Sequence, residues 1–388
     1  MTIMSDEITF GKDFIVERLI QLCEERKRNF RGYKHRKLPY HRNCYLYKLG
    51  LHGKNIKKKV IKWDKCTRCV GSCFIGHLDT GDWISTDKKR ELSDSLNSSN
   101  HIDWLLHLSQ KRYRDHSSHQ LFVGILGWFL LRCRINNPSN PGRTISLKRW
   151  MSQKLTKKMQ EHDKRKQVTE EQVEIIWWMA SLFHDYAYPL SHILKVVPSV
   201  TERNREASLK QIWSLMGFTR SKKNKVFERV YDDEFLKDLL TIVKQKKDIN
   251  KRKKALQSIY KNRLSGYFDD DELKESLNHC YDHGLLGAAH LSALLEKERN
   301  TIIDTVIRAI GIHNGAVYSK QVNIEKDPIA FLLILCDECQ EWERHIAVGD
   351  KVMSESKWIR IQGIQKRGKN FIIKDNPTII FEFPDAVK

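Results

Sequence analysis

Apolar residues recur at helical spacing over most of the chain between His101 and Ile346. Segments with this period are typical of helices that pack against a common core. The stretch from Asn136 to Gly142 is rich in Asn, Pro and Gly and marks a turn between two of them. We predict helices over 101–112, 115–134, 146–163, 169–187, 205–216, 223–245, 247–263, 270–279, 284–297, 299–313 and 327–345.

The period changes to two in the C-terminal tail. Ile359 and Ile361 alternate with Arg360 and Gln362, and further apolar runs follow turn signals at 366–370 and 375–377. Such alternation is typical of strands with one buried face, and it predicts an antiparallel meander of about three strands. The predicted fold class is therefore mainly α. A helical domain over 101–346 lies between an irregular N-terminal region, 1–100, and a small β meander, 347–388.

One predicted helix ends in two titratable residues. The segment from Val173 to Phe183 is almost wholly apolar, and His184 and Asp185 follow it directly. A helix that is apolar nearly all round is buried. Pro189 disfavours helical geometry at the residue before it, so we expect the helix to end within one turn of His184. A buried carboxylate needs a cation or strong donors. The alternative is a turn Asp beside a hydrogen-bonded His.

Other metal-capable residues lie on the apolar faces of predicted helices. His119 precedes Val123 and Leu126 by four and seven residues, which places His119 on the core face of its helix. A single buried His is usually a core residue that has found hydrogen bonds. Several such residues on separate helices, together with the His184-Asp185 pair, are harder to explain as unrelated core residues with hydrogen bonds. Similar positions on three other predicted helices are held by His283, His313 and Asp337.

These residue types predict a divalent metal ion as cofactor. Two imidazoles and two carboxylates form a mixed nitrogen and oxygen set that suits Mn, Fe, Ni, Co, Mg or Zn and leaves positions for water. Such an ion acidifies its bound water and generates hydroxide near neutral pH. The set that we predict comprises His119, His184, Asp185 and Asp337.

The order of His119, then His184-Asp185, then Asp337 resembles the H…HD…D signature of the HD-domain phosphohydrolase superfamily. The resemblance covers about residues 101–345 and implies an all-α bundle around the metal. It implies that the four residues bind one ion, and that His283 and His313 bind a second ion or act as phosphate-binding, acid–base groups. His116 is a rival for the first ligand, but the apolar stripe favours His119. Supporting phrases are Arg112-Tyr-Arg-Asp-His-Ser-Ser-His119, His184-Asp-x-x-Tyr-Pro189, Asp282-His-Gly-x-x-Gly-Ala288, Ile310-Gly-Ile-His313-Asn and Leu335-Cys-Asp337-Glu-Cys-Gln-Glu-Trp342.

The chain departs from the family pattern in two ways. Many members carry Gly-Lys three and four residues after the motif His, where this chain has Ala187 and Tyr188. That Lys helps to hold phosphate in some members. The motifs of the cyclic-dinucleotide branch, an HHE pair and a Gly-Tyr-Pro element, are absent, so the resemblance assigns no subfamily. We assign the phosphate-binding role instead to Arg112, Arg114, Tyr188 and Lys195.

The charge of the chain favours anionic partners. The formal net charge is +21, which makes nucleic acid, nucleotides or phosphorylated small molecules plausible ligands. Residues 26–42 carry eight Lys and Arg with interleaved aromatics and no acid. Such an arm suits phosphate contacts and base stacking. A solvated surface arm is the alternative.

The nine cysteines are an odd number, and several lie in apolar helical contexts, which favours reduced thiols and a cytoplasmic location. No apolar run reaches the roughly 20 residues of a membrane helix, and the N-terminus does not resemble a secretory signal. We therefore expect no membrane partner. A structural zinc site is one interpretation of a cysteine cluster, and incidental cysteines are the other. The cluster comprises Cys44, Cys66, Cys69, Cys73 and His77.

The sequence thus supports three hypotheses. The first is a metal-dependent phosphohydrolase that hydrolyses a phosphoester of a nucleotide or related molecule, with His283, His313 and Asp185 in catalytic roles. The second is a nuclease or nucleic-acid-associated HD protein that uses the basic N-terminal arm. The third is a non-catalytic module that senses a nucleotide.

Overall fold

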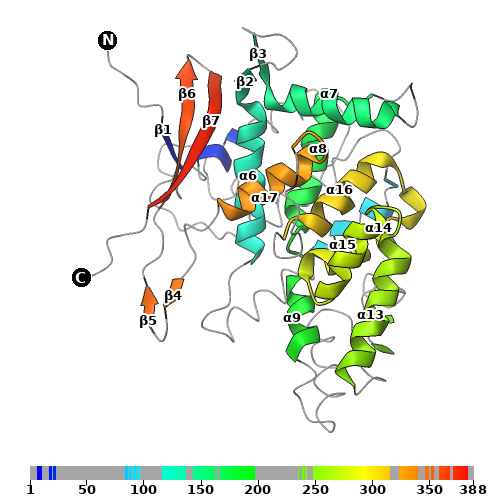
Figure 1. The fold of residues 1–388 in the computed structure, drawn as a ribbon. Coiled ribbons are helices and arrows are strands. Elements are labelled where there is room, and N and C mark those ends of the chain that lie inside the picture. Colours follow the sequence, from blue (N-terminus) through cyan, green and yellow to red (C-terminus); the bar gives the residue numbers. More distant parts are fainter. Residues whose placement is uncertain are drawn as a thin grey trace, which may run out of the picture. The chain divides into compact units, whose positions relative to one another are not determined.

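The computed structural model of the chain describes residues 7–10, 17–19, 21–22, 84–85, 87–89, 91–93, 95–96, 116–136, 143–161, 164, 167–196, 235, 238–239, 241–242, 248–314, 322, 324–339, 346–348, 351–353, 358–367 and 370–382. The described part is mainly helical, as the sequence predicts, with strands from the two ends of the chain and from a short segment after its first long helix (Figure 1). The chain divides into two compact units. Unit 1 comprises residues 1–70, 121–178 and 335–388, and unit 2 comprises 71–120 and 179–334. The predicted boundaries at 100 and 346 stay predictions.

Most of the predicted helices are present, with ends that differ by a few residues. Apolar positions at helical spacing fix their buried faces, and side-chain caps fix several of their starts. Ser146, Asp248, Asp269, Asp282 and Asn300 each accept a hydrogen bond from a backbone N–H of the first turn that follows. The α-helices with described bounds are α6 (His116–Arg132), α7 (Leu147–Gln160), α8 (Glu170–Phe183), α9 (Tyr188–Val196), α13 (Ile249–Leu264), α14 (Asp270–Ser276), α15 (His283–Leu294), α16 (Thr301–Ile312) and α17 (Pro328–Glu338). Two single-turn 3-10 helices are η3 (Leu277–His279) and η4 (Glu296–Glu298).

The single helix predicted over 169–187 is wrong at its C-terminal end. Helix α8 ends at Phe183, within one turn of His184 as expected, but a second helix, α9, starts at Tyr188. Pro189 is the second residue of α9, where its missing N–H is not needed for the helix and its fixed φ suits the first turn. The proline therefore starts a helix as well as following the end of one.

The predicted helices over 101–112 and 205–216 lie outside the described residues.

The β structure of unit 1 is larger than the predicted meander. Its five-stranded sheet has the order β1-β6-β7-β2-β3, and β4 and β5 form a separate hairpin. Three of the five strands come from outside the tail, because β1 pairs with β6 and β2 joins β7 in parallel. The strands are β1 (Glu7–Phe10), β2 (Arg134–Asn136), β3 (Thr144–Ser146), β4 (Ile346–Val348), β5 (Lys351–Met353), β6 (Trp358–Arg367) and β7 (Asn370–Glu382).

The turn predicted at 375–377 is also wrong, whereas the chain does turn between Arg367 and Asn370. Strand β7 runs through 375–377, and the pairing with β6 is irregular there, since Thr378 pairs with Gln362 but Ile373 pairs with Ile364. Proline cannot donate to a strand ladder and is tolerated at such bulges. Pro377 therefore interrupts the pairing without ending the strand.

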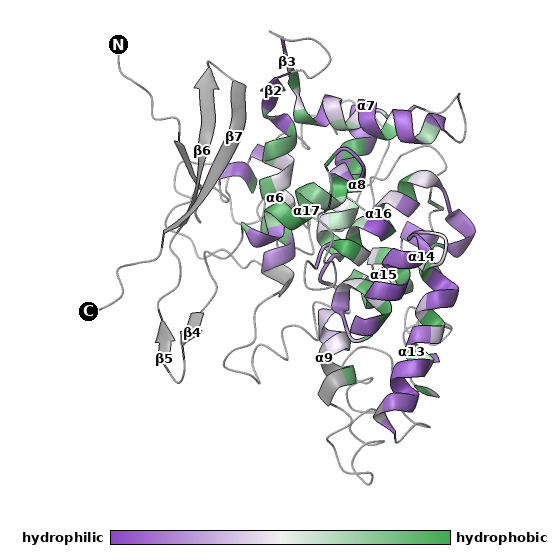
Figure 2. Cartoon of the chain, in the orientation of Figure 1, coloured by the Kyte–Doolittle hydropathy of each residue, from purple (hydrophilic) through white to green (hydrophobic). Residues whose placement is uncertain are grey.

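Two apolar helices of unit 1 approach closely. The indole N–H of Trp177 on α8 donates to the carbonyl oxygen of Gly124 on α6, at 2.8 Å. A Cβ atom at Gly127 would overlap the Trp177 ring, so only glycine allows this approach. Figure 2 shows the apolar character of α6, α8 and α17.

Cys133, Cys336 and Cys339 are buried and free, and burial raises the pKa of Cys133 to about 12.

A partly buried cluster of charges surrounds Arg308 on α16, in unit 2. The guanidinium donates to both carboxylate oxygens of Glu272, at 2.7 and 2.9 Å, and to both of Asp327, at 2.8 and 2.9 Å. It also donates to the carbonyl oxygen of Tyr267 at 3.1 Å. Glu272 belongs to α14, and the carbonyl of Asp327 accepts the N–H of Phe331 in α17. Arg308 therefore fixes α14, α16 and the start of α17 to one another.

This cluster predicts a loss of stability in acid. Burial acts to raise the pKa of Glu272, but the hydrogen bonds and charge of Arg308 outweigh it, and the pKa is lowered from 4.5. A carboxyl whose folded pKa is lowered stabilises the fold above its unfolded pKa and loses that contribution as the pH falls below it. The free energy of unfolding should therefore decrease as the pH falls below about 4.5. In Glu272→Gln this part of the decrease should be missing, which urea unfolding across that pH range would test.

None of the described helices is long and apolar enough to cross a membrane.

Candidate metal centre

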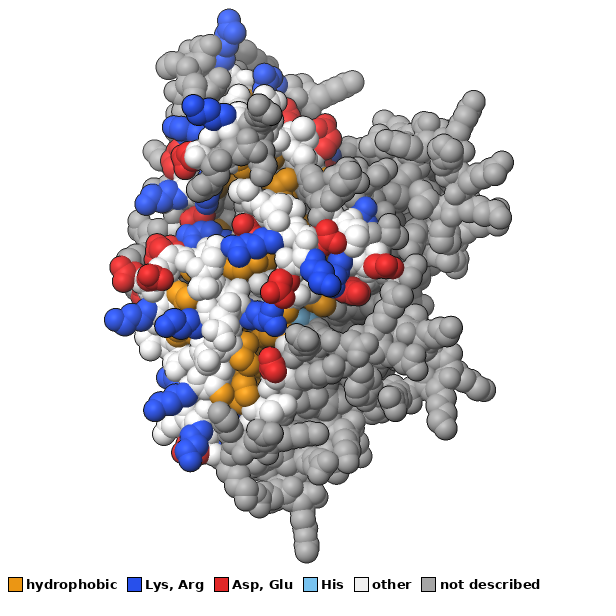
Figure 3. All heavy atoms as spheres, turned by 90° about the vertical axis from the view of Figure 1, so that its right-hand side faces the viewer, with side chains coloured by type: hydrophobic (Ala, Val, Ile, Leu, Met, Phe, Trp, Pro, Cys, Tyr) orange, Lys and Arg blue, Asp and Glu red, His pale blue; other side chains and the backbone are white. Residues whose placement is uncertain are grey.

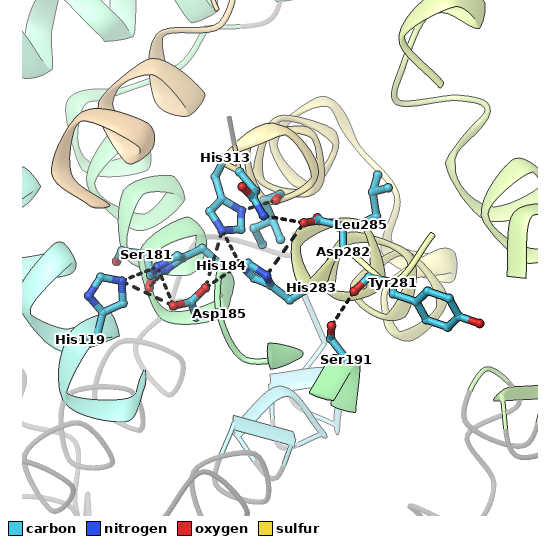
Figure 4. A network of polar contacts seen from close by, with 12 residues as sticks. His119, Ser181, His184, Asp185, Ser191, Tyr281, Asp282, His283, Leu285 and His313 are labelled. Carbon is cyan, nitrogen blue, oxygen red and sulfur yellow. Dashed lines mark hydrogen bonds and ion pairs between the residues drawn. The ribbon is translucent and has the colours of Figure 1, made fainter. Parts of the chain in front are cut away.

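Five titratable residues of unit 2 converge from four helices. His184 and Asp185 directly follow the last residue of α8, and His119 lies in the first turns of α6. His283 is the first residue of α15, and His313 is the C-cap of α16. Figure 4 shows their side chains pointing toward one another. The break between α8 and α9 places Asp185 where all four histidines can reach it.

Asp185 lies at the centre of this network, with histidines on both sides. Its Oδ2 atom is 3.5 Å from Nε2 of His119 and 3.6 Å from Nε2 of His184. Its Oδ1 atom is 2.9 Å from Nε2 of His283 and 3.6 Å from Nε2 of His313. The Asp185 side chain is 6% exposed. One buried carboxylate thus faces two pairs of imidazoles, one pair at each oxygen.

Backbone carbonyls fix the orientation of two of the rings. Nδ1 of His184 lies 2.8 Å from the carbonyl oxygen of Ser181, and Nδ1 of His313 lies 2.6 Å from that of Ile310. A carbonyl oxygen only accepts, so each Nδ1 carries the hydrogen. In the neutral ring, Nε2 then presents a lone pair, which is the state of a metal-binding histidine. Both of these lone pairs are directed at the Asp185 carboxylate and at another imidazole.

The spacing of these atoms fits metal coordination. An ion held by three ligands at about 2.0–2.2 Å requires ligand atoms that are roughly 3.0–3.6 Å apart. Nε2 of His119 and Nε2 of His184 are 3.3 Å apart, and both lie at similar distances from Oδ2 of Asp185. On the other side, Nε2 of His283 and Nε2 of His313 are 3.1 Å apart. His184, Asp185 and His313 together form a buried group that could hold a metal ion.

Asp282 supports the second histidine pair, a role that the sequence analysis did not assign. Its Oδ1 caps α15 by accepting the N–H of Leu285 at 3.0 Å, and its Oδ2 accepts from Asn314 at 2.6 Å. Oδ2 also lies 3.9 Å from Nδ1 of His283. One carboxylate therefore ties the start of α15 to the residue after His313. The available signal was an Asp directly before an apolar helix, which is typical of an N-cap.

Gly284 allows the two histidine-bearing helices to approach, and this gives a second prediction. A Cβ atom there would lie 2.8 Å from the carbonyl oxygen of Ile310 and 3.0 Å from Cε1 of His313. Because the nearest atom is backbone, Gly284→Ala should push α15 and α16 apart, at a cost of about 1–3 kcal/mol in the free energy of unfolding. We also expect it to weaken metal binding.

The matched control is Gly287→Ala, one turn along the same helix. Its Cβ would meet nothing closer than 3.3 Å, at Cε1 of Tyr186. Thermal unfolding with and without added metal would compare the two variants. Equal unfolding temperatures and equal metal-induced shifts would contradict the packing role of Gly284.

The structure describes only some of the remaining predicted site residues. The ring of Tyr188 lies beside that of His283, with 5.2 Å between centroids, at the margin of the network. His116 and Lys195 lie on α6 and α9, in parts of these helices where only the backbone is described. Asp337 is a half-buried residue of α17, in unit 1, and its role as a ligand stays a prediction. Outside the described residues lie Arg112, Arg114, Cys44, Cys66, Cys69, Cys73 and His77.

The comparisons with known proteins do not extend this description. The chain matches no protein-family model, no curated protein and no solved structure. The resemblance to HD domains therefore rests on the residues quoted above. What the structure adds is a cluster of buried His and Asp side chains that could bind a metal ion.

Proposed function

We propose that the chain is a metal-dependent phosphohydrolase that hydrolyses a phosphoester, of a nucleotide or a related phosphorylated molecule. The observation that carries the proposal is the arrangement around Asp185, where two pairs of imidazole Nε2 atoms face the two oxygens of one buried carboxylate. In the neutral rings of His184 and His313, the lone pair of Nε2 is directed at the Asp185 carboxylate. This contact is repulsive unless a cation lies between them. The donor set therefore favours positive charge between them.

His119, His184 and Oδ2 of Asp185 would hold one divalent ion. Asp337 is the proposed fourth ligand, as the H…HD…D order of the sequence implies. His283, His313 and Oδ1 of Asp185 would hold a second ion. If only one ion binds, N–H groups of the two imidazoles, and not Oδ1, would contact a phosphoryl oxygen. When bound, a divalent ion supplies an acidified water as nucleophile and neutralises charge on the phosphoryl oxygens.

The side chains have separate tasks in this proposal. His184 and His313 donate Nδ1–H to backbone carbonyls, which directs their Nε2 atoms at Asp185, where they would act as ligands of an ion. His283 is the best candidate to protonate the leaving group, because its side chain is 16% exposed whereas that of His313 is 1% exposed. Tyr188, beside His283, would contact the part of the substrate that departs.

A test is a screen of the purified full chain with Mn²⁺, Mg²⁺, Ni²⁺ and Fe²⁺ against p-nitrophenyl phosphate, bis(p-nitrophenyl) phosphate and a panel of nucleotides. We expect metal-dependent hydrolysis of at least one substrate. His283→Gln should lower kcat by roughly 100-fold or more, the usual contribution of a general acid. A metal-loaded protein that hydrolyses none of these compounds would contradict the proposal and favour a nucleotide sensor.

A further inference from the structure

Helix α13 presents a surface that the proposed hydrolysis does not use. One side of the helix is anchored within unit 2, where Leu256, Tyr260 and Leu264 are buried. The hydroxyl of Tyr260 donates to the carbonyl oxygen of Cys280 at 2.8 Å, and Gln257 donates to that of Leu277 at 2.8 Å. The opposite side faces solvent, and Figure 2 shows the polar character of this helix.

The exposed side of α13 carries basic and neutral polar groups, and the exposed acid beside it, Asp248, caps the start of the helix. The helix carries six Lys and Arg and no acid. The described exposed residues of the helix and its two caps are Asp248, whose carboxylate accepts the N–H of Asn250 at the start of the helix, and Asn250, Lys251, Lys254, Ser258, Lys261, Asn262 and Ser265. The neighbouring α14 differs, because it exposes Asp270 and Asp271 beside Lys274. The composition of α13 is therefore not a general property of the surface of this unit.

Five of these residues form a straight line, which we call the lysine stripe: Lys251, Lys254, Ser258, Lys261 and Ser265. Their intervals of three and four residues place them on one face of a helix. At about 1.5 Å per residue the stripe is about 21 Å long. Figure 3 shows mainly Lys and Arg side chains at the height that α13 occupies in Figure 1, whereas both charge signs are mixed nearer the middle of that face.

Two of the three lysines of the stripe lie where they do not stabilise the helix. Lys251 and Lys254 lie in its first two turns, near the positive end of the helix dipole, and they repel each other at a spacing of three residues. Within the part of the chain that the structure describes, neither they nor Lys261 form an ion pair. An arrangement that is locally unfavourable and has no compensating contact is expected at functional surfaces.

We propose that the lysine stripe binds the sugar–phosphate backbone of a nucleic acid. Ammonium and hydroxyl groups are the usual donors to phosphate oxygens. With about 3.4 Å of axis per phosphate in one strand, a stripe of this length spans roughly six phosphates. No aromatic ring is exposed among the described residues of α13, so the surface contacts the backbone and does not stack on bases.

The same observations argue against a membrane surface as the partner. A helix that binds at a membrane interface inserts an apolar face between lipids. The apolar face of α13 is already buried in unit 2, through Leu256, Tyr260 and Leu264. The stripe could offer a membrane only charge, whereas a nucleic acid strand matches both its charge and its linear form.

The test measures binding of the full chain to fluorescein-labelled DNA of mixed sequence, about 20 nucleotides long, as single strand and as duplex, at salt concentrations from about 50 to 300 mM. The variant is Lys251→Gln/Lys254→Gln/Lys261→Gln. We expect its Kd to rise roughly 10- to 100-fold near 100 mM salt, and the slope of log Kd against log salt to fall by about 2, which corresponds to three lost phosphate contacts.

The matched control is Lys157→Gln/Lys274→Gln/Lys297→Gln, which removes the same charge from exposed lysines of other elements. It should change Kd by less than about 3-fold, because only contacts to phosphate contribute to the salt-dependent affinity. Equal weakening by both triple variants would show attraction by net charge alone and overturn the proposal. Unchanged DNA binding by the stripe variant would also overturn the proposal. The same holds if the chain binds vesicles of anionic lipid through the stripe but does not bind DNA. Hydrolytic activity should be unaffected in both variants, which separates this inference from the proposed function.

Discussion

Asp185→Asn should remove most of the metal-binding capacity of the chain. Asn keeps the shape of the side chain, but it replaces a charge that faces His119 and His184 through one oxygen and His283 and His313 through the other. Loss of a residue that merely orients a ligand lowers metal affinity by about 10- to 100-fold, so loss of a shared ligand should lower it by at least about 100-fold. Titration of metal-free protein with Mn²⁺ would measure the change.

The control for this substitution is Asp304→Asn, which alters a carboxylate of α16 that pairs with Arg299. A chelator should lower the melting temperature of the wild type and of this control, because a ligand that binds only the folded state stabilises it. It should leave that of Asp185→Asn unchanged. Equal metal content in all three proteins would show that Asp185 is not a ligand.

Arg308→Ala should lower the free energy of unfolding by about 3 kcal/mol. The substitution leaves the carboxylates of Glu272 and Asp327 together and without their cation, and removing one partner from a buried ion pair costs about 3–5 kcal/mol. The Arg308 and Glu272 side chains are 18% and 13% exposed, so we expect the lower end of that range. Urea unfolding at neutral pH would measure the loss.

Arg263→Ala is the matched control, because Arg263 forms a single ion pair at 2.9 Å with Glu296, whose side chain is 70% exposed. Exposed pairs of this kind contribute at most about 1 kcal/mol. If the two variants lost the same stability, the Arg308 cluster would not be what holds α14, α16 and the start of α17 together. Arg308→Ala should also weaken metal binding, because Arg308 holds α16 in place and His313 is the C-cap of that helix.

The sequence was sufficient to predict most of the described helices and to select the histidines that the structure brings together. Helical spacing of large apolar residues is a local signal, and His119 was selected because Val123 and Leu126 share its face. The structure buries His119 at 2% exposure, with its Nε2 atom facing His184 and Asp185. The predicted end of the helix within one turn of His184 is confirmed, since α8 ends at Phe183. Pro189 is not its cause, because Tyr188 and Pro189 already belong to α9.

Features that depend on distant partners were not predictable from spacing. The strands β1, β2 and β3 are short, and they join the sheet only because the C-terminal hairpin offers an edge on each side. The Arg308 cluster combines residues from three separate segments, none of which is unusual in its own sequence. The division of the four histidines between the two oxygens of Asp185 likewise depends on how α15 and α16 pack across Gly284.

The most direct test of the central claim is the position of a bound metal in crystals. Protein loaded with Mn²⁺ or Fe²⁺ should give an anomalous scattering peak between Nε2 of His119, Nε2 of His184 and Oδ2 of Asp185. A second peak beside His283 and His313 would identify two ions, whereas a single peak would leave that pair for phosphate. Crystals of metal-loaded, folded protein that show no peak at Asp185 would contradict the account.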